Sequence, residues 1–189
     1  FLELTQSSEK RYEFIDGVIY EMASPKTVHQ QALGELHYMF ASWFRGKPCR
    51  PMLAPYDITL HRFAENINVV QPDLMVICDL EEKVNQQGYY MGVPDLVVEI
   101  LSESTRGKDC IKKMDLYVST GVREYWIVNP FNEDVTVHRF EEQDLADSRH
   151  FRTGDVAESF LFSGLKVPVQ ALFSKGSPAN GPARRLAQS

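Results

Sequence analysis

The stretch Asp95-Leu96-Val97-Val98-Glu99-Ile100-Leu101 decides the fold of this chain. It is short and almost continuously apolar, which is typical of a strand that is covered on both faces of a sheet. A polar connection at residues 102–107 leads to a helical pattern at 108–119, which Gly121 ends. Another apolar strand follows at residues 123–128. A strand–helix–strand passage of this kind predicts a right-handed crossover between two parallel strands.

The residues around this unit supply the remaining elements of an α/β domain. Asp16-Gly17 provides the positive-φ positions of a tight hairpin turn. Thr27 precedes a run of apolar residues at helical spacing and is the predicted N-cap of that helix. The predicted elements are a hairpin over residues 12–22, a helix over 28–44, strands over 56–60, 72–79 and 135–140, a polar loop through Asn68, and a loop over 81–92.

The composition is that of an ordinary globular protein. The chain has 189 residues, of which 43% are hydrophobic and 24% charged, so one domain with a sizeable core is expected. We predict a single domain over residues 1–173 and a disordered tail over 174–189, where Gly, Ser, Pro and Ala prevail. No apolar run approaches the ~20 residues of a membrane span, so no membrane partner is expected.

The cysteines and the N-terminal sequence favour a cytoplasmic location. Cys49, Cys78 and Cys110 are odd in number and far apart, and no two of them form a C-x-x-C pair. This pattern predicts three separate buried side chains instead of a disulfide framework or a zinc site. No signal peptide is visible in the first residues.

The net charge of −6 argues against a nucleic-acid partner, because a basic face normally supplies that binding. The charge is unevenly distributed, however. A basic cluster follows the stretch quoted above, and it consists of Arg106, Lys108, Lys112 and Lys113. Charge alone therefore leaves DNA as one candidate partner among others.

Two acidic residues stand inside apolar strands, where an ionised carboxylate needs a cation or full hydrogen bonding. Glu99 interrupts the central strand, and Asp73 begins the one before it. A strand-end cap or a salt bridge explains either residue alone, whereas two such acids on neighbouring strands favour a shared metal ion. Asp95 is a poorer partner for Glu99, because four residues of strand separate their Cα atoms by ~13 Å.

Lys113 is the lysine of the 108–119 helix that is best placed for function. On a helical wheel it lies at the edge of the apolar arc, from which its ammonium can reach towards the sheet. Lys112 lies almost opposite the centre of that arc, and Lys108 is also well outside it. The alternative for Lys113 is a helix-edge lysine that extends its charge into solvent.

These residues belong to three segments that together resemble a known family. The segments are PDLVVEILSESTRGKDCIKKMDLYVSTGVREYWIVNP (94–130), YEFIDGVIYEM (12–22) and QPDLMVICD (71–79). They resemble the Uma-type restriction endonuclease family of the PD-(D/E)xK nuclease superfamily, roughly from Tyr12 to Phe173. The resemblance implies a restriction-endonuclease-like αβββαβ core, with a central mixed sheet flanked by helices and an N-terminal β-hairpin. It also implies Mg²⁺- or Mn²⁺-dependent hydrolysis of DNA, and it makes a homodimer a candidate assembly.

The resemblance assigns roles to individual residues. Asp73 and Glu99 match the two metal-binding acids, with the backbone carbonyl of Ile100 as a further expected ligand. The motif lysine is absent, since Leu101 stands two residues after Glu99, but Lys113 matches the lysine on this family's helix. The remaining candidates are Arg106, Lys108 and Lys112 for DNA binding, and His29 and Asp57 as lower-ranked site residues.

Two alternatives to a DNA endonuclease remain open. One is a catalytically inactive module of the nuclease fold that binds DNA or protein, which the missing motif lysine would suit. The other is a metal-dependent phosphohydrolase that acts on a small molecule, which the net negative charge favours mildly. For His29, a structural role in a hydrogen bond is an equal alternative.

Overall fold

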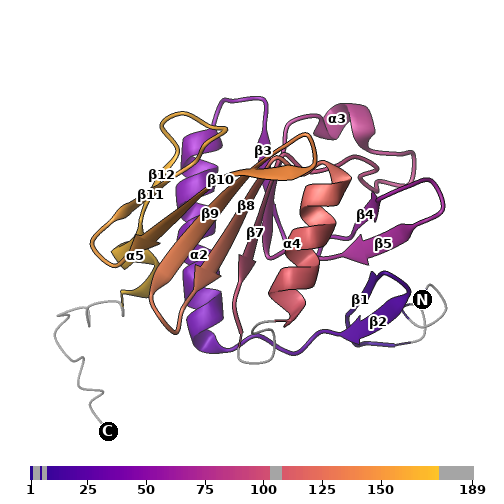
Figure 1. Cartoon of the computed structure of the whole chain (residues 1–189), viewed down its shortest axis with the longest axis horizontal. Coiled ribbons are helices and arrows are strands. Elements are labelled where there is room, and N and C mark those ends of the chain that lie inside the picture. The colour runs from indigo at the N-terminus through magenta and orange to yellow at the C-terminus, as the bar shows by residue number, and fades with distance from the viewer. Residues whose placement is uncertain (2–4, 6–7, 103–107, 175–189) are drawn as a thin grey trace, which may run out of the picture.

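The computed structural model describes residues 1, 5, 8–102 and 108–174, without the side chains of residues 108–110. A six-stranded sheet forms its centre, with helices on both faces (Figure 1). In spatial order its strands are β10 (Asp144–Arg152), β9 (Asp134–Glu141), β8 (Glu124–Asn129), β7 (Leu96–Ile100), β6 (Leu74–Ile77) and β3 (Arg50–Leu53). The described helices are α2 (Thr27–Phe44), α3 (Leu80–Lys83), α4 (Lys108–Thr120) and α5 (Val169–Phe173).

The predicted crossover is confirmed, because β7 and β8 are parallel neighbours joined through α4. The other neighbouring pairs of this sheet are antiparallel. Taken in chain order, α2, β3, β6, β7, α4 and β8 give the expected αβββαβ core within a mixed sheet. The predicted fold class is therefore confirmed.

Strand β7 divides its side chains between two hydrophobic clusters. Leu96, Val98 and Ile100 pack on the side of α2, together with α5 and the β11 (Val156–Glu158) and β12 (Lys166–Pro168) pair. Val97 lies in the other cluster, which holds the apolar residues of α4. Because side chains alternate along a strand, Glu99 also faces the α4 side.

A second sheet contains the predicted hairpin. Its strands run in the order β2 (Val18–Glu21), β1 (Tyr12–Ile15), β5 (Ile67–Val70) and β4 (Ile58–His61). Asp16 and Gly17 form the hairpin turn with φ values of 47° and 82°, as predicted. Ile15, Ile58 and Leu60 of this sheet join the cluster beneath α4, so the hairpin is packed beside that helix.

Several elements differ from the predictions. Asn68 lies within β5 instead of a loop, and residues 81–92 include part of α3 and the buried Tyr90. Thr27 is the first residue of α2, and the N-cap Lys26 makes no capping bond from its side chain. Strands β3, β10, β11 and β12 and helix α5 were not predicted, and residues 175–189 of the predicted tail lie outside the described residues.

The prediction of three separate cysteines is wrong, because Cys49 and Cys78 form a disulfide. The cause is the antiparallel pairing of β3 with β6. That register places Arg50 opposite Ile77, so the residues just outside this pair are brought side by side. Their 29-residue separation in sequence gave no indication of this pairing. The side chain of Cys110 is outside the described part of the chain.

Candidate active site

A pocket of about 450 Å³ opens between the β1–β2 hairpin, the start of α2 and the ends of β6 and β7. Its lining includes the side chains of five polar residues from these elements and from α4. They are Glu13, His29, Asp73, Glu99 and Lys113. These five residues are up to 100 positions apart in the sequence.

Asp73 stands directly before β6 and is fixed by two hydrogen bonds to one oxygen. Its Oδ2 accepts the backbone N–H of Ile100 at 2.7 Å and the Nε2–H of His29 at 3.2 Å. The β6–β7 register pairs Leu74 with Val98, so its continuation places Asp73 opposite Glu99. Side chains at such opposed positions have Cβ atoms ~5 Å apart. The two acids thus lie on neighbouring strands at the same end of the sheet.

The side chain of Glu99 is only 12% exposed and is held through one of its oxygens. Its Oε1 accepts hydrogen bonds from Lys113 Nζ at 2.9 Å and from Tyr117 OH at 2.6 Å. Burial and the nearby charges of Asp73 and Glu13 raise the pKa of Glu99 to about 7, although Lys113 acts in the opposite direction. Burial also raises the pKa of Tyr117 well above its ordinary value, so this hydroxyl keeps its proton and remains a donor.

Lys113 reaches from α4 to the floor of the pocket, where it contacts two carboxylates. Its Nζ lies 2.9 Å from Oε1 of Glu99 and 2.9 Å from Oε1 of Glu13. Burial acts to lower the pKa of Lys113, but the two negative charges outweigh it and raise that pKa above its ordinary value. Lys113 is therefore a buried, charged ammonium at neutral pH.

Glu13 is the residue of this group that sequence reasoning missed. It lies on β1 with its side chain 7% exposed, and it accepts the backbone N–H of Gln71 at 3.0 Å in addition to Lys113. The available signal was its alternation with Ile15, since residues two apart on a strand share a face. Ile15 belongs to the core cluster beside α4, and Glu13 faces the same way.

Charges are unbalanced within the group formed by Glu13, Asp73, Glu99 and Lys113, while the rest of the pocket lining adds Arg11, Lys112 and Glu21. Glu13, Asp73 and Glu99 contribute three carboxylates, and Lys113 contributes one ammonium. A divalent cation would neutralise the difference. In Asp73 and in Glu99 the bonds described above all fall on one oxygen, and no residue in the described part of the chain donates a hydrogen bond to the second oxygen of either carboxylate.

The available ligand atoms suit a hard cation that also binds water and substrate, and they do not form a metal site from protein ligands alone. Within the described ranges, no three His, Cys, Asp or Glu side chains converge closely enough to hold a metal by themselves. Mg²⁺ is commonly bound by one or two carboxylates together with water and substrate oxygens. Two carboxylate oxygens beside the Ile100 backbone fit that pattern.

Comparisons with known proteins agree with this fold. A family model described as "Putative restriction endonuclease", named Uma2, matches residues 1–170. The chain belongs to the Uma2 family. An uncharacterized protein of Synechocystis sp. is 25% identical over 146 residues, which cover 76% of this chain and 74% of that protein. A crystal structure titled as a putative nuclease of DUF820 from Anabaena variabilis ATCC 29413 superposes with a TM-score of 0.72 and 21% identity, over 92% of this chain and 94% of that one.

Membership of Uma2 places the chain among restriction-endonuclease-like proteins, and the solved structure shares its fold. In this Uma2 member the geometry brings together Asp73, Glu99, Lys113 and His29, which the sequence had singled out. Leu101 also lines the pocket and supplies no ammonium, whereas Lys113 reaches the same place from α4.

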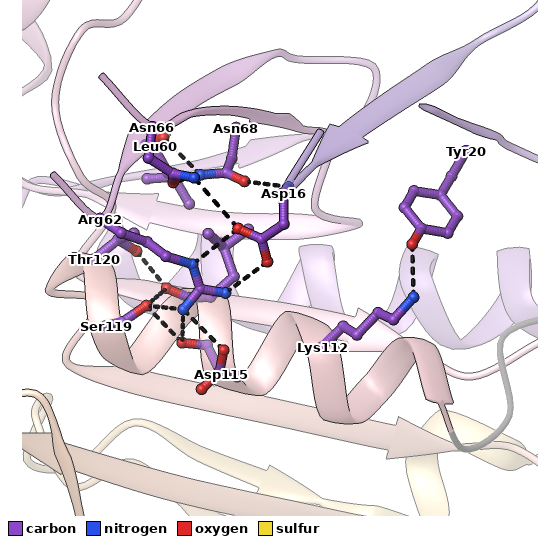
Figure 2. Close-up of polar contacts among 11 residues, drawn as sticks. Asp16, Tyr20, Leu60, Arg62, Asn66, Asn68, Lys112, Asp115, Ser119 and Thr120 are labelled. Carbon is purple, nitrogen blue, oxygen red and sulfur yellow. Dashed lines mark hydrogen bonds and ion pairs between the residues drawn. The ribbon is translucent and has the colours of Figure 1, made fainter. Parts of the chain in front are cut away.

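The other predicted residues are not part of this group. Asp57 is exposed, accepts a hydrogen bond from Gln71 Nε2 at 2.7 Å and is not among the residues that line the pocket. Lys112 lines the pocket and donates to Tyr20 OH at 2.6 Å (Figure 2). Arg106 and the side chain of Lys108 lie outside the described part of the structure.

No described helix is long and apolar enough to cross a membrane.

Proposed function

We propose that this Uma2 protein is a metal-dependent endonuclease that hydrolyses DNA phosphodiester bonds. One observation carries the proposal. The carboxylate of Asp73 stands at a position opposite Glu99, and the ammonium of Lys113 lies 2.9 Å from the Glu99 carboxylate at the floor of one pocket. Two carboxylates with an adjacent buried cation suit the binding and cleavage of a phosphodiester.

In this proposal each described residue has a distinct role. Asp73 and Glu99 would hold Mg²⁺ or Mn²⁺, with the backbone carbonyl of Ile100 as a third protein ligand. When bound, the metal ion would polarise the scissile phosphate and lower the pKa of a water molecule. Lys113 stabilises the negative charge that develops on the phosphate in the transition state. His29 orients the Asp73 carboxylate through its Nε2–H.

Basic side chains at the pocket support DNA as the substrate. Arg11 and Lys112 both line the pocket, where they can contact phosphates on either side of the one that is cut. Arg106 and Lys108 extend this basic set as predictions from the sequence. A cytoplasmic location and a homodimer, which would offer one site to each DNA strand, complete the proposal.

The test is cleavage of supercoiled plasmid by the purified protein with Mg²⁺, with Mn²⁺ or with EDTA. We expect cleavage only with metal, and a loss of more than about 100-fold for Asp73→Asn and for Glu99→Gln. Asp95→Asn is a matched control, because Asp95 and Asp73 have the same side-chain exposure of 16% and Asp95 lies outside the pocket lining. A wild-type protein that leaves plasmid intact under all metal conditions would contradict the proposal and favour an inactive module of this fold.

A small-molecule phosphohydrolase is the second candidate, and the size of the pocket favours it. A volume of about 450 Å³ falls within the ~300–1,000 Å³ of small-molecule sites, and the net charge is −6. A panel of nucleotides and phosphate esters, assayed beside plasmid under the same metal conditions, separates the two. Faster turnover of a small ester than of any DNA would select this candidate.

A further inference from the structure

Glu13 lies outside the αβββαβ core, yet it contacts the lysine of the candidate active site. It is the second residue of β1, in the hairpin that precedes α2. Its Oε1 is fixed by two donors, Lys113 Nζ at 2.9 Å and the backbone N–H of Gln71 at 3.0 Å. Gln71 is two residues before Asp73 in the sequence. The Glu13 carboxylate is thus anchored to the same segment that supplies a proposed metal ligand.

We propose that Glu13 is a positioning residue, which holds the Lys113 ammonium at the pocket floor while Glu99 binds the metal ion. This inference rests on the proposed function. A lysine has a flexible four-carbon chain, so a single contact fixes its ammonium poorly. Glu99 cannot be the sole anchor, because its carboxylate is also expected to bind the ion. Glu13 supplies a second contact at the same 2.9 Å distance from Nζ.

The hairpin that carries Glu13 is fastened to α4 at its turn. Arg62, just after β4, pairs with Asp16 in the turn at 3.1 Å and with Asp115 on α4 at 2.8 Å. The same guanidinium donates to Ser119 Oγ at 2.6 Å (Figure 2). The side chain of Arg62 is only 17% exposed, whereas those of Asp16 and Asp115 are 49% and 69% exposed, so these ion pairs lie at the protein surface.

A second contact fastens the other strand of the hairpin to α4. Lys112 Nζ donates to Tyr20 OH at 2.6 Å, and Tyr20 lies on β2 (Figure 2). Lys113 is the next residue of α4, and Glu13 pairs with Tyr20 in the hairpin register. The contact between Glu13 and Lys113 is therefore set by the docking of the hairpin on the helix.

Two other roles for Glu13 make different predictions. As a metal ligand, it would contribute directly to the affinity for Mn²⁺. As a purely structural partner, it would change folding stability and lower activity independently of Lys113. A positioning residue instead acts through Lys113, so its removal has no further effect once the lysine is gone.

The test is a double-mutant cycle on metal-dependent cleavage with Glu13→Gln, Lys113→Met and the double variant. We expect Glu13→Gln to lower kcat about 10- to 100-fold and to leave the Mn²⁺ dissociation constant within about threefold of the wild type. The double variant should be no slower than Lys113→Met alone. Multiplicative losses in the double variant, or loss of Mn²⁺ binding by Glu13→Gln, would overturn the positioning role.

Two further variants control this experiment. Glu65→Gln changes an exposed acid in the loop between β4 and β5 that does not line the pocket, and it should keep wild-type activity. Glu13→Asp keeps the charge with a shorter side chain, so it should recover part of the activity, and it replaces Glu13→Gln if that variant does not fold. A wild type without metal-dependent cleavage overturns the proposed function. An active wild type with a fully active Glu13→Gln overturns the positioning role alone.

Discussion

The Oδ2 atom of Asp73 accepts the backbone N–H of Ile100 at 2.7 Å, so the side chain of one strand end is bonded to the backbone of the neighbouring strand. This bond lies directly beside Glu99 in the chain. It anchors Asp73 near Glu99, whose pKa the charge of Asp73 helps to raise. His29 bonds the same oxygen from α2, so both of these bonds fall on Oδ2, and Oδ1 of Asp73 is the atom that we propose binds the metal ion.

We expect His29→Ala to weaken Mn²⁺ binding and to lower activity about 10-fold, because Asp73 loses one of the donors that orient it. Isothermal titration with Mn²⁺ measures the first effect, and plasmid cleavage the second. His37→Ala changes another histidine of α2 that does not line the pocket, and it should retain both properties. Unchanged Mn²⁺ affinity in His29→Ala would leave His29 with a structural role only.

The raised pKa of Glu99 predicts a pH-dependent stability for the metal-free protein. Burial moves this pKa from 4.5 to about 7, so between these values the folded state binds a proton more tightly than the unfolded chain. The free energy of unfolding therefore falls as the pH rises through this window, by up to about 3 kcal/mol. Glu99→Gln has no carboxyl group to titrate at this position. Its free energy of unfolding relative to the wild type should therefore rise as the pH increases through the same window.

Urea unfolding of both proteins in EDTA, at about pH 5 and about pH 8, measures this difference. Saturating Mg²⁺ provides the control, because a cation at Glu99 removes the advantage of the protonated form. Parallel pH profiles for the wild type and Glu99→Gln would contradict the assignment of this titration to Glu99.

The Arg62 contacts predict a coupling between the stability of the hairpin and activity. Arg62→Met removes the pairs with Asp16 and Asp115, and we expect it to lower the free energy of unfolding by about 1 kcal/mol, because both carboxylates are exposed to solvent. Cleavage should fall with it, since Glu13 is carried on the released hairpin. Lys10→Met removes the exposed Lys10–Glu21 pair and should change neither quantity measurably. An unstable Arg62→Met with full activity when folded would separate the hairpin from catalysis.

Glu124 is a buried acid for which we predict a structural role. Its Oε2 accepts the backbone N–H groups of Phe160 and Leu161, both at 2.8 Å, and its Oε1 accepts Trp126 Nε1 at 2.5 Å. Glu124→Ala leaves these donors unpaired and should cost at least about 3 kcal/mol of stability. Mn²⁺ affinity of the folded fraction should not change, and Glu141→Ala, on an exposed acid, should alter neither property.

The proposed metal-binding pair and the proposed catalytic lysine could be selected from the sequence because each breaks a local pattern. Glu99 and Asp73 are acids in apolar strands, and Lys113 stands at the edge of an apolar helical arc. The same pattern occurs at Glu124, however, whose partners at residues 159–161 belong to a region where no element was predicted. A buried acid in a strand therefore indicates a strong local partner and does not by itself distinguish a metal from hydrogen-bond donors.

Glu13 and the disulfide were missed because both depend on tertiary pairing. Glu13 meets Lys113 only after the hairpin docks on α4, and no local period records that contact. Cys49 and Cys78 meet only through the β3–β6 register, and β3 itself was not predicted. The αβββαβ order was more accessible, since its strands and helices have clear apolar patterns of their own.

The contact between Glu13 and Lys113 joins residues 100 positions apart, which has a consequence for how the molecule folds. Contacts of long sequence separation close large loops, and they form after local elements such as α4. The pocket floor would thus be completed at a late stage of folding, when β1 packs against α4, which lies about 100 residues further along the chain. Local opening of the hairpin would release the lysine while the central sheet stays intact, so hydrogen exchange at the site can exceed that of the core beneath it.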